Sequence, residues 1–159
     1  MPELPEVETV RKGLEDRLAN FWIAKIEVCR ERAVASKGGA PEFISKMNRS
    51  LVGEWRRRGK YLIANLYHKA SPPSNNPEAL SLSGFWVIHL RMTGQFQWHK
   101  DGSKKPCFHT RVRFWNNQGE ELRFVDVRSF GEMWWISPDK PPEDTLEGLK
   151  KLGPEPFSK

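Results

Sequence analysis

Cysteine and long hydrophobic runs are both scarce in this sequence. The two cysteines, Cys29 and Cys107, are far apart and form no Cys-x-x-Cys pair, so no zinc site is expected. No apolar run approaches the about 20 residues that a bilayer span requires. The prolines and glutamates of residues 2–6 do not form a signal peptide. These absences favour a cytoplasmic protein, with no metal, no small-molecule cofactor and no membrane partner, and we expect a monomer.

The composition is that of a globular chain with a basic surplus. Its 159 residues are 38% hydrophobic and 29% charged, which suits one domain with a tail. Lys and Arg number 26 against 20 Asp and Glu, so the net charge is +6. This surplus favours an anionic partner such as nucleic acid, although a basic surface with no such partner fits the charge equally well.

Hydrophobic spacing predicts helices first and then many strands. Val7, Val10, Leu14 and Leu18 recur at helical spacing within residues 5–19, and a short second helix is expected at 41–47. Eight short strands are expected at 21–28, 51–57, 61–67, 85–90, 95–98, 111–115, 121–125 and 132–136. The polar residues 116–119 predict a hairpin turn. We therefore expect an α+β, mostly β fold: a two-layer antiparallel β-sandwich with flanking helices.

The C-terminal segment reads differently from the rest. Residues 137–142 carry three prolines and interrupt the strand pattern. A short helix is expected to run through Lys151, capped by Asp144 or Thr145 and closed by Gly153. We divide the chain into a β-sandwich domain at 1–139 and a short helix with the start of an interdomain linker at 140–159.

The first residues offer a nucleophile. Removal of Met1 would leave Pro2 with a free secondary amine, and an α-amino group titrates near ~7.7–8, against ~10.4 for lysine. The positive end of the following helix would lower that pKa further. Such an amine can attack a sugar's anomeric carbon and form an iminium, with Glu3 to move protons and Glu6 as a second carboxylate. The alternative is that the prolines only shape the helix entry and the glutamates cap it.

Four segments, in order, resemble formamidopyrimidine-DNA glycosylases. They are the start at 1–11, a lysine loop at 57–62, a His-Leu-x-Met-x-Gly turn at 89–94 and an Asp-x-Arg-x-Phe-Gly loop at 126–131. Residues 109–112 and 152–156 also fit. The resemblance covers nearly the whole chain but only the N-terminal part of the family's length.

The resemblance implies catalytic roles for residues near the N-terminus. Pro2 matches the family's nucleophile and Glu3 its general acid at the sugar ring oxygen. Lys60 matches the lysine that grips the phosphate beside the lesion, and Glu6 a carboxylate lining the lesion pocket.

The resemblance also implies DNA-binding roles further along the chain. His89 matches a phosphate contact, and His109 lies in a segment that fits the family's DNA-binding face. Met92, Arg128 and Phe130 match the side chains that fill the gap left by a flipped base, a role that suits apolar wedges and a hydrogen-bonding arginine. Lys60 and the nearby Arg56–Arg58 form a local basic cluster suited to phosphates. Without the family context, Met92 and Phe130 could be core residues, His89 a core histidine and Arg56–Arg58 a solvated strand edge.

The implied activity is base-excision repair of damaged double-stranded DNA. The family removes 8-oxoguanine and formamidopyrimidine through a Schiff base on the N-terminal proline, followed by β,δ-elimination. Its helical DNA-binding module and zinc finger are expected beyond this chain, so we expect weak or no activity from these residues alone. If Met1 stays attached, the nitrogen of Pro2 is an amide and cannot form the iminium.

Two rival functions remain open. An endonuclease VIII-like glycosylase for oxidised pyrimidines shares the nucleophile and the lysine, but typically starts Pro-Glu-Gly-Pro-Glu, whereas Leu4 stands here. The second rival is a non-catalytic, basic β-sandwich that binds DNA.

Overall fold

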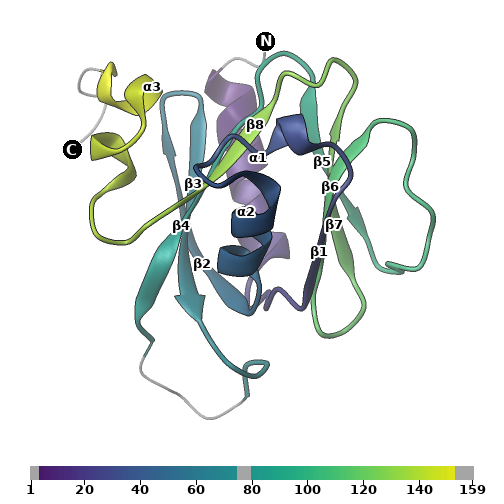
Figure 1. The fold of residues 1–159 in the computed structure, drawn as a ribbon. Helices are drawn as coiled ribbons and strands as arrows, with labels where there is room; N and C mark the ends of the chain where they lie inside the picture. The colour runs from purple at the N-terminus through teal and green to yellow at the C-terminus, as the bar shows by residue number, and fades with distance from the viewer. Residues whose placement is uncertain (1–3, 75–79, 153–159) are drawn as a thin grey trace.

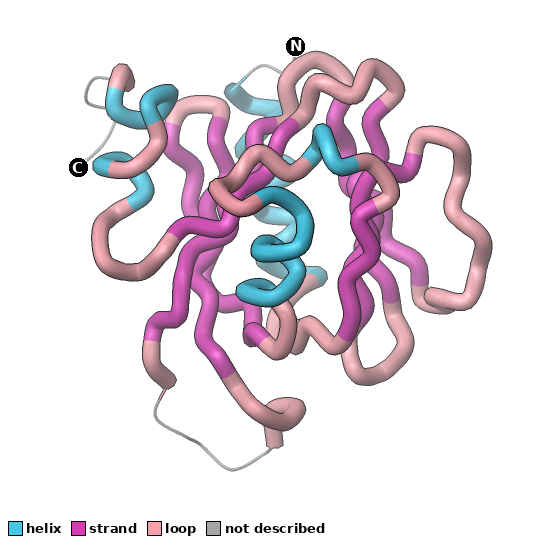
Figure 2. Tube along the Cα trace, in the orientation of Figure 1, coloured by secondary structure: helices cyan, strands magenta, loops and turns pink. Residues whose placement is uncertain are grey.

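The protein, described by a computed structural model over residues 4–74 and 80–152, folds as two four-stranded antiparallel sheets. One sheet has the strand order β2-β3-β4-β8 and the other the order β1-β6-β7-β5. The strands are β1 (Lys25–Val28), β2 (Ser50–Arg58), β3 (Tyr61–His68), β4 (Leu82–His89), β5 (Gly94–His99), β6 (Thr110–Trp115), β7 (Glu121–Asp126) and β8 (Glu132–Ile136). The predicted sandwich of eight strands is therefore confirmed, and Figures 1 and 2 show the two layers.

The space between the sheets is filled by large aromatic side chains. Trp86 of β4 lies 4.7 Å from Phe114 of β6 and 5.4 Å from Trp55 of β2, measured between ring centroids. Phe124 of β7 is fully buried in the same cluster. Burial of this apolar surface is the main stabilisation of the two layers.

Helices close both open sides of the sandwich. Helix α1 (Leu4–Arg17) packs on β2, and α2 (Gly39–Met47) contacts β1 and β8, the edge strands of opposite sheets. In Figure 1, α2 stands in front of the gap between the layers and α1 behind it. Val7 and Leu14 are the buried residues of α1, as the helical spacing predicts.

Residues 21–28 do not form the single strand that the sequence predicts. The chain crosses from one sheet to the other within this segment. Ile23 donates its amide to Ser50 of β2, whereas the Ala24 amide bonds to Trp115 of β6. Only Lys25–Val28 then pairs as a strand, because the apolar residues before it pack between the layers rather than in one ladder.

The segment after β8 covers the outer face of the first sheet. It forms η2 (Pro142–Asp144) and α3 (Glu147–Lys150), and Leu149 packs there with Ile63, Phe85 and Val87. This second cluster explains why the apolar run of β4 does not alternate: both of its faces are buried. The prediction that Asp144 or Thr145 caps the helix is wrong, because Leu146 occupies the N-cap and makes no side-chain cap. Gly153 lies outside the described residues.

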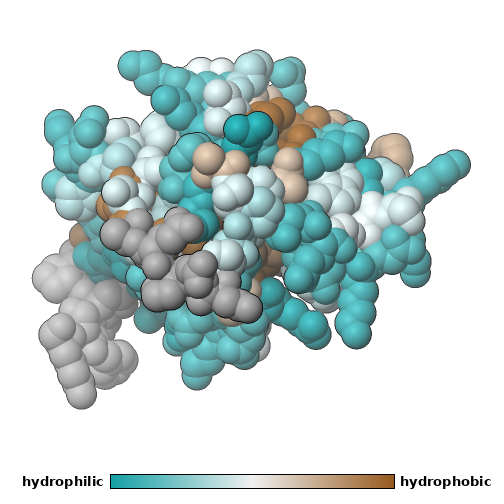
Figure 3. All heavy atoms as spheres, turned by 90° about the horizontal axis from the view of Figure 1, so that it is seen from below, coloured by the Kyte–Doolittle hydropathy of each residue, from teal (hydrophilic) through white to brown (hydrophobic). Residues whose placement is uncertain are grey.

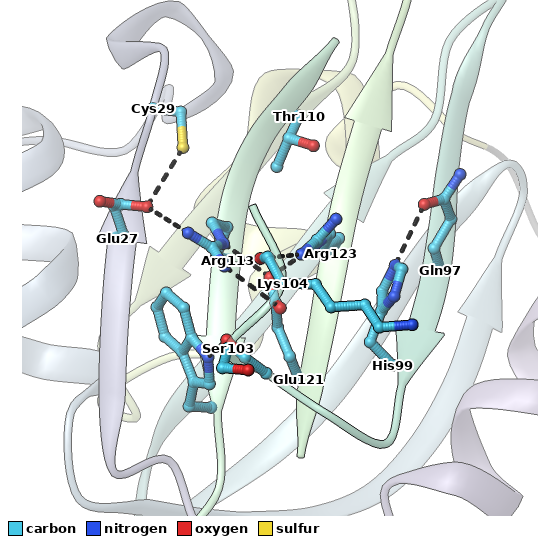
Figure 4. Close-up of polar contacts among 12 residues, drawn as sticks. Glu27, Cys29, Gln97, His99, Ser103, Lys104, Thr110, Arg113, Glu121 and Arg123 are labelled. Carbon is cyan, nitrogen blue, oxygen red and sulfur yellow. Dashed lines mark hydrogen bonds and ion pairs between the residues drawn. The ribbon is translucent and has the colours of Figure 1, made fainter. Parts of the chain in front are cut away.

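The outer face of the second sheet carries a charged cluster instead (Figure 4). Glu121, fully buried, accepts hydrogen bonds of 2.7 Å from both Arg113 and Arg123. Both guanidinium groups also donate to the carbonyl of Lys104, at 3.0 and 2.6 Å. The cluster thus fastens the loop of residues 100–109 to the sheet through the Lys104 carbonyl.

The hairpin turn at 116–119 follows the sequence prediction. The Asn116 side chain accepts hydrogen bonds from the amides of Gln118 and Glu120, and Gly119 supplies the positive φ of the hairpin turn.

The end of the molecule at the bottom of Figure 1 is mostly hydrophilic in Figure 3, with hydrophobic side chains only in small, separate patches.

Candidate functional site

Two turns meet at the end of the sandwich that is uppermost in Figure 1. The β4–β5 turn covers residues 90–93 and the β7–β8 connection residues 127–131. Gly94 directly follows the first turn and Gly131 ends the second, and a Cβ added at either glycine would come within 3.0 Å of the Phe124 ring. Because any larger residue would push the turns away from this ring, the two glycines let both turns share one buried anchor.

Three residues predicted to act on DNA come together on these turns. Met92 and Phe130 are 48% and 44% exposed although both are large and apolar, so the alternative that they are core residues is wrong. The guanidinium Nη1 of Arg128 lies 3.4 Å from the Met92 Sδ. Met92 and Phe130 also line one shallow pocket, of about 400 Å³. The structure therefore presents two apolar side chains and a cation side by side at one exposed end.

Arginines that the sequence analysis did not single out surround this group. The Arg32 guanidinium lies 5.5 Å from the centre of the Phe130 ring, within cation–π range. Arg91, at a positive φ of 55°, forms an ion pair with Glu132. No spacing rule pointed to Arg32, since η1 (Glu31–Ala33), which carries it, is remote in sequence from both turns.

The start of α1 lies beside the same turns. Glu6 is exposed and lines an open groove of about 570 Å³ together with Met92 and Thr93. The groove continues between α1 and β5, where Val10, Leu14 and Phe96 make its walls largely apolar. Pro2 and Glu3, the predicted nucleophile and general acid, lie outside the described residues.

Lys60 and His89 are neighbours at the same end of the first sheet. Lys60 lies in the β2–β3 turn, where Gly59 takes a φ of 60°, and the next residue, Tyr61, pairs with His89 of β4. The rings of Tyr61 and His89 meet edge to face, with 4.7 Å between their centroids. The structure thus brings Lys60 near His89, and the family resemblance assigns a phosphate contact to each of them.

His89 is a buried, neutral histidine. Burial lowers its pKa to about 4, and the charges of Arg91 and Lys60 add to this effect. Its Nδ1 accepts a hydrogen bond of 3.0 Å from the Arg91 amide, so Nε2 carries the proton of the neutral ring. It can thus offer one N–H donor but no positive charge at neutral pH.

The arginines before Lys60 are engaged within the protein. Arg56 forms a bidentate ion pair with Glu143, at 2.5 and 2.9 Å. Arg57 lies 3.5 Å from Glu8 of α1, and Arg58 donates to the carbonyl of Leu152. These contacts tie the β2–β3 hairpin to α1 and to the C-terminal segment, which is a structural role.

His109 is attached to the turns through its backbone. Its carbonyl accepts the amide of Asp126 at 3.0 Å, and its ring contacts that of Phe108 edge to face at 5.1 Å. Phe108 is 86% exposed, so the end of the 100–109 loop places two rings next to the β7–β8 connection.

The described part of the chain shows no group of three or more His, Cys, Asp or Glu side chains that could hold a metal ion. Within the same residues, no helix is both long and apolar enough to cross a membrane.

Taken together, these features define a class of protein: a helix-flanked β-sandwich that presents apolar and cationic side chains at one end. Residues 1–133 match the family model for the formamidopyrimidine-DNA glycosylase N-terminal domain. The chain belongs to this family.

Relatives and solved structures agree with that assignment. The chain is 60% identical to a formamidopyrimidine-DNA glycosylase of Prochlorococcus marinus (strain MIT 9313), over 99% of this chain and 54% of the relative. It is 30% identical to Lactococcus lactis Fpg in a complex with abasic-site DNA, with a TM-score of 0.78 over 98% of this chain and 51% of that one. It is also 30% identical to MutM bound to DNA that contains carbocyclic 8-oxo-G, with a TM-score of 0.71 over 87% of this chain and 45% of that one. The chain thus spans about half the length of the curated relatives it matches.

Proposed function

We propose that this chain is the catalytic half of a bifunctional DNA glycosylase and abasic-site lyase that removes oxidised purines from double-stranded DNA. The observation that carries the proposal is the gathering of Met92, Arg128 and Phe130 beside the start of α1 in a chain of this family. Binding of damaged DNA by similar solved structures supports the same partner.

The side chains at the two turns suit the extrusion of a base. Taking a nucleotide out of the stack costs a few kcal/mol, and a protein can offset this by filling the hole. Met92 and Phe130 can wedge into the stack because they are apolar and half exposed. Arg128 can hydrogen-bond the base left unpaired on the opposite strand, which favours cytosine through its acceptor groups.

The chemistry proposed for Pro2 is a displacement at the sugar. Its neutral secondary amine attacks C1′, the bond from C1′ to the oxidised purine breaks, and the base leaves with a proton. Glu3 protonates the ring oxygen, so the ring opens to an iminium. Loss of the C2′ proton then expels the 3′ phosphate, and loss of the C4′ proton from the resulting unsaturated iminium afterwards expels the 5′ phosphate. Glu6 would line the lesion pocket. Lys60, His89 and His109 would hold the DNA backbone by charge and by N–H donors.

Borohydride trapping tests this proposal. The methionine-processed chain, checked by intact mass, is mixed with a duplex carrying 8-oxoguanine or an abasic site, and sodium borohydride reduces any iminium to a stable adduct. We expect an adduct that Pro2→Gly lowers by at least about tenfold. Pro5→Gly, three residues further on, is the matched control and should still trap.

The rival functions make different predictions in the same assay. An adduct with thymine glycol that exceeds the adduct with 8-oxoguanine would favour an enzyme for oxidised pyrimidines. The same assay can be repeated with the C-terminal half of the Prochlorococcus marinus MIT 9313 relative joined to this chain. If both proteins bind DNA and neither forms an adduct, a non-catalytic DNA-binding module is favoured. We expect the isolated chain to bind weakly, because affinity scales with the number of phosphates neutralised.

A further inference from the structure

We propose that Asp126 and Thr93 form a positioning pair that fixes the relative placement of Met92, Arg128 and Phe130. The inference rests on the proposed function of those three side chains. Asp126 ends β7 and Thr93 lies in the β4–β5 turn, so the pair joins the two turns that carry the three side chains.

The hydrogen bonds connect the turns in one fixed direction. The Thr93 hydroxyl donates to Oδ1 of Asp126 and accepts the Arg128 amide at 3.1 Å. The other carboxylate oxygen, Oδ2, accepts the Gly131 amide at 2.6 Å. A hydroxyl has a single proton, and an amide N–H can only donate. The Thr93 oxygen therefore accepts from Arg128 and gives its own proton to Asp126, which determines the direction of both hydrogen bonds.

Each of the three proposed DNA-contacting residues stands at or next to one of these bonds. Met92 precedes Thr93, Arg128 donates its own amide, and Phe130 precedes Gly131. The side chains themselves stay exposed, whereas Asp126 is fully buried. The pair therefore governs where the three side chains stand without occupying the surface that would meet DNA.

The backbone of Asp126 extends the connection to a third segment. Its amide donates to the carbonyl of His109 at 3.0 Å, and its carbonyl accepts Nε of Arg111 at 2.9 Å. Through one residue the β7–β8 connection, the β4–β5 turn and the end of the 100–109 loop are held together.

Both turns contain a residue that needs such support. Arg91 and Ser129 have positive φ values of 55° and 60°, a conformation that residues other than glycine rarely adopt. A backbone conformation of this kind persists only where surrounding contacts hold it in place, and it is common at functional sites whose side chains need a defined position. A buried carboxylate that accepts one hydrogen bond on each oxygen supplies that restraint.

A base-filling wedge needs this rigidity. A misplacement of about 1 Å can cost large factors in rate, because binding energy is then used to order the protein instead of displacing the base. Loss of the Thr93 hydroxyl should therefore affect the extrusion of a base from a duplex. It should leave untouched a reaction in which no base has to be displaced.

The test compares Thr93→Val, which removes the hydroxyl at nearly constant shape, with Thr93→Ser, which keeps it. Thr145→Val is the control, because it removes an exposed hydroxyl that bonds the Pro141 carbonyl far from the turns. All variants are made in this chain joined to the C-terminal half of the Prochlorococcus marinus MIT 9313 relative. The two readouts are single-turnover excision of 8-oxoguanine opposite cytosine and borohydride trapping on a single-stranded oligonucleotide with a preformed abasic site.

We expect Thr93→Val to slow excision from the duplex about tenfold or more, while single-strand trapping stays within about twofold of the wild type. Thr93→Ser and Thr145→Val should behave as the wild type in both assays. The proposal is overturned if Thr93→Val excises at the wild-type rate, or if it loses both activities in equal measure. Absence of any adduct from the wild type would instead count against the proposed function itself, so the two failures are distinguishable. Asp126→Asn, if it folds, should follow Thr93→Val.

Discussion

Two apolar side chains, Met92 and Phe130, are left half exposed by a fold that buries most others of their size. Since neither side chain is buried in the core, Met92→Ala and Phe130→Ala should each change the free energy of unfolding by no more than about 0.5 kcal/mol. Excision of an oxidised purine from duplex DNA should nevertheless fall by a factor of ten or more, at about 1.4 kcal/mol per factor of ten. Urea unfolding and single-turnover excision measure the two effects.

Phe124→Ala is the matched control for these variants. Its ring is fully buried under both turns, so its loss should destabilise the fold by about 3–5 kcal/mol. If Phe130→Ala destabilised the protein as much as Phe124→Ala does, the wedge interpretation of Phe130 would be wrong.

His89 makes stability depend on pH. Its pKa of about 4 in the folded protein lies below the ordinary 6.5, so below pH 6.5 the unfolded chain takes up a proton that the folded protein does not. The contribution of neutral His89 to the free energy of unfolding is therefore complete above pH 6.5 and is lost as the pH falls toward 4. Between pH 7.5 and 5.5 this loss amounts to about 1 kcal/mol. In His89→Asn, whose side-chain oxygen can still accept the Arg91 amide, this part of the loss should vanish. An identical pH dependence in both proteins would contradict it.

The site residues were predictable from sequence only as far as motifs reach. The grouping of Met92, Arg128 and Phe130 followed from the family resemblance, and the structure confirms that they are close together. The motif also contains Asp126 and Thr93, but nothing in the sequence says that a carboxylate after β7 bonds a hydroxyl 33 residues earlier. Arg32 carried no signal, because its place over Phe130 depends on the tertiary structure alone.

At the scale of elements, short runs of apolar and β-branched residues, together with the turn residues, predicted the eight strands well. The helix at 5–19 and the strand at 132–136 correspond closely to α1 and β8. The prediction of a strand was wrong at residues 21–24, which connect the two sheets. This connection is largely buried, so it is as apolar as a strand and looks like one in the sequence. The sequence prediction failed again at α3, which lacks a polar cap because tertiary packing of Leu149 holds so short a helix in place.

The β6–β7 pair is fastened by Glu121, and a substitution there should show it. Burial alone would raise the pKa of Glu121, but hydrogen bonds from Arg113 and Arg123 outweigh burial and lower it. Glu121→Gln leaves two guanidinium groups buried without a carboxylate, so it should destabilise the protein by about 3 kcal/mol. It should also loosen the loop at Lys104 and hasten its cleavage by trypsin there.

Glu147→Gln provides the comparison for that experiment. Its carboxylate is 77% exposed and pairs with Lys150 on the surface of α3. An exposed pair of this kind contributes about 0–1 kcal/mol, so the variant should unfold close to the wild type. Equal effects at Glu121 and Glu147 would contradict a stabilising role for the buried cluster.

At the scale of the whole molecule, one end of the sandwich collects the chemistry and the rest supports it. The turns at 90–93 and 127–131, the β2–β3 turn with Lys60, the end of β4 with His89 and the start of α1 all lie toward that end. Relatives of about twice this length add a second half. We propose that this half supplies most of the remaining grip on DNA.

The most direct measurement locates the trapped sugar on the protein. After borohydride reduction on an abasic-site duplex and digestion with nuclease and trypsin, mass spectrometry should find the adduct on the peptide that starts at Pro2 and ends at Arg11. An adduct on the Lys60 peptide instead would contradict the mechanism proposed for this protein. The mechanism would equally be contradicted if no adduct formed on a chain that has a free Pro2 amine and is joined to a relative's C-terminal half.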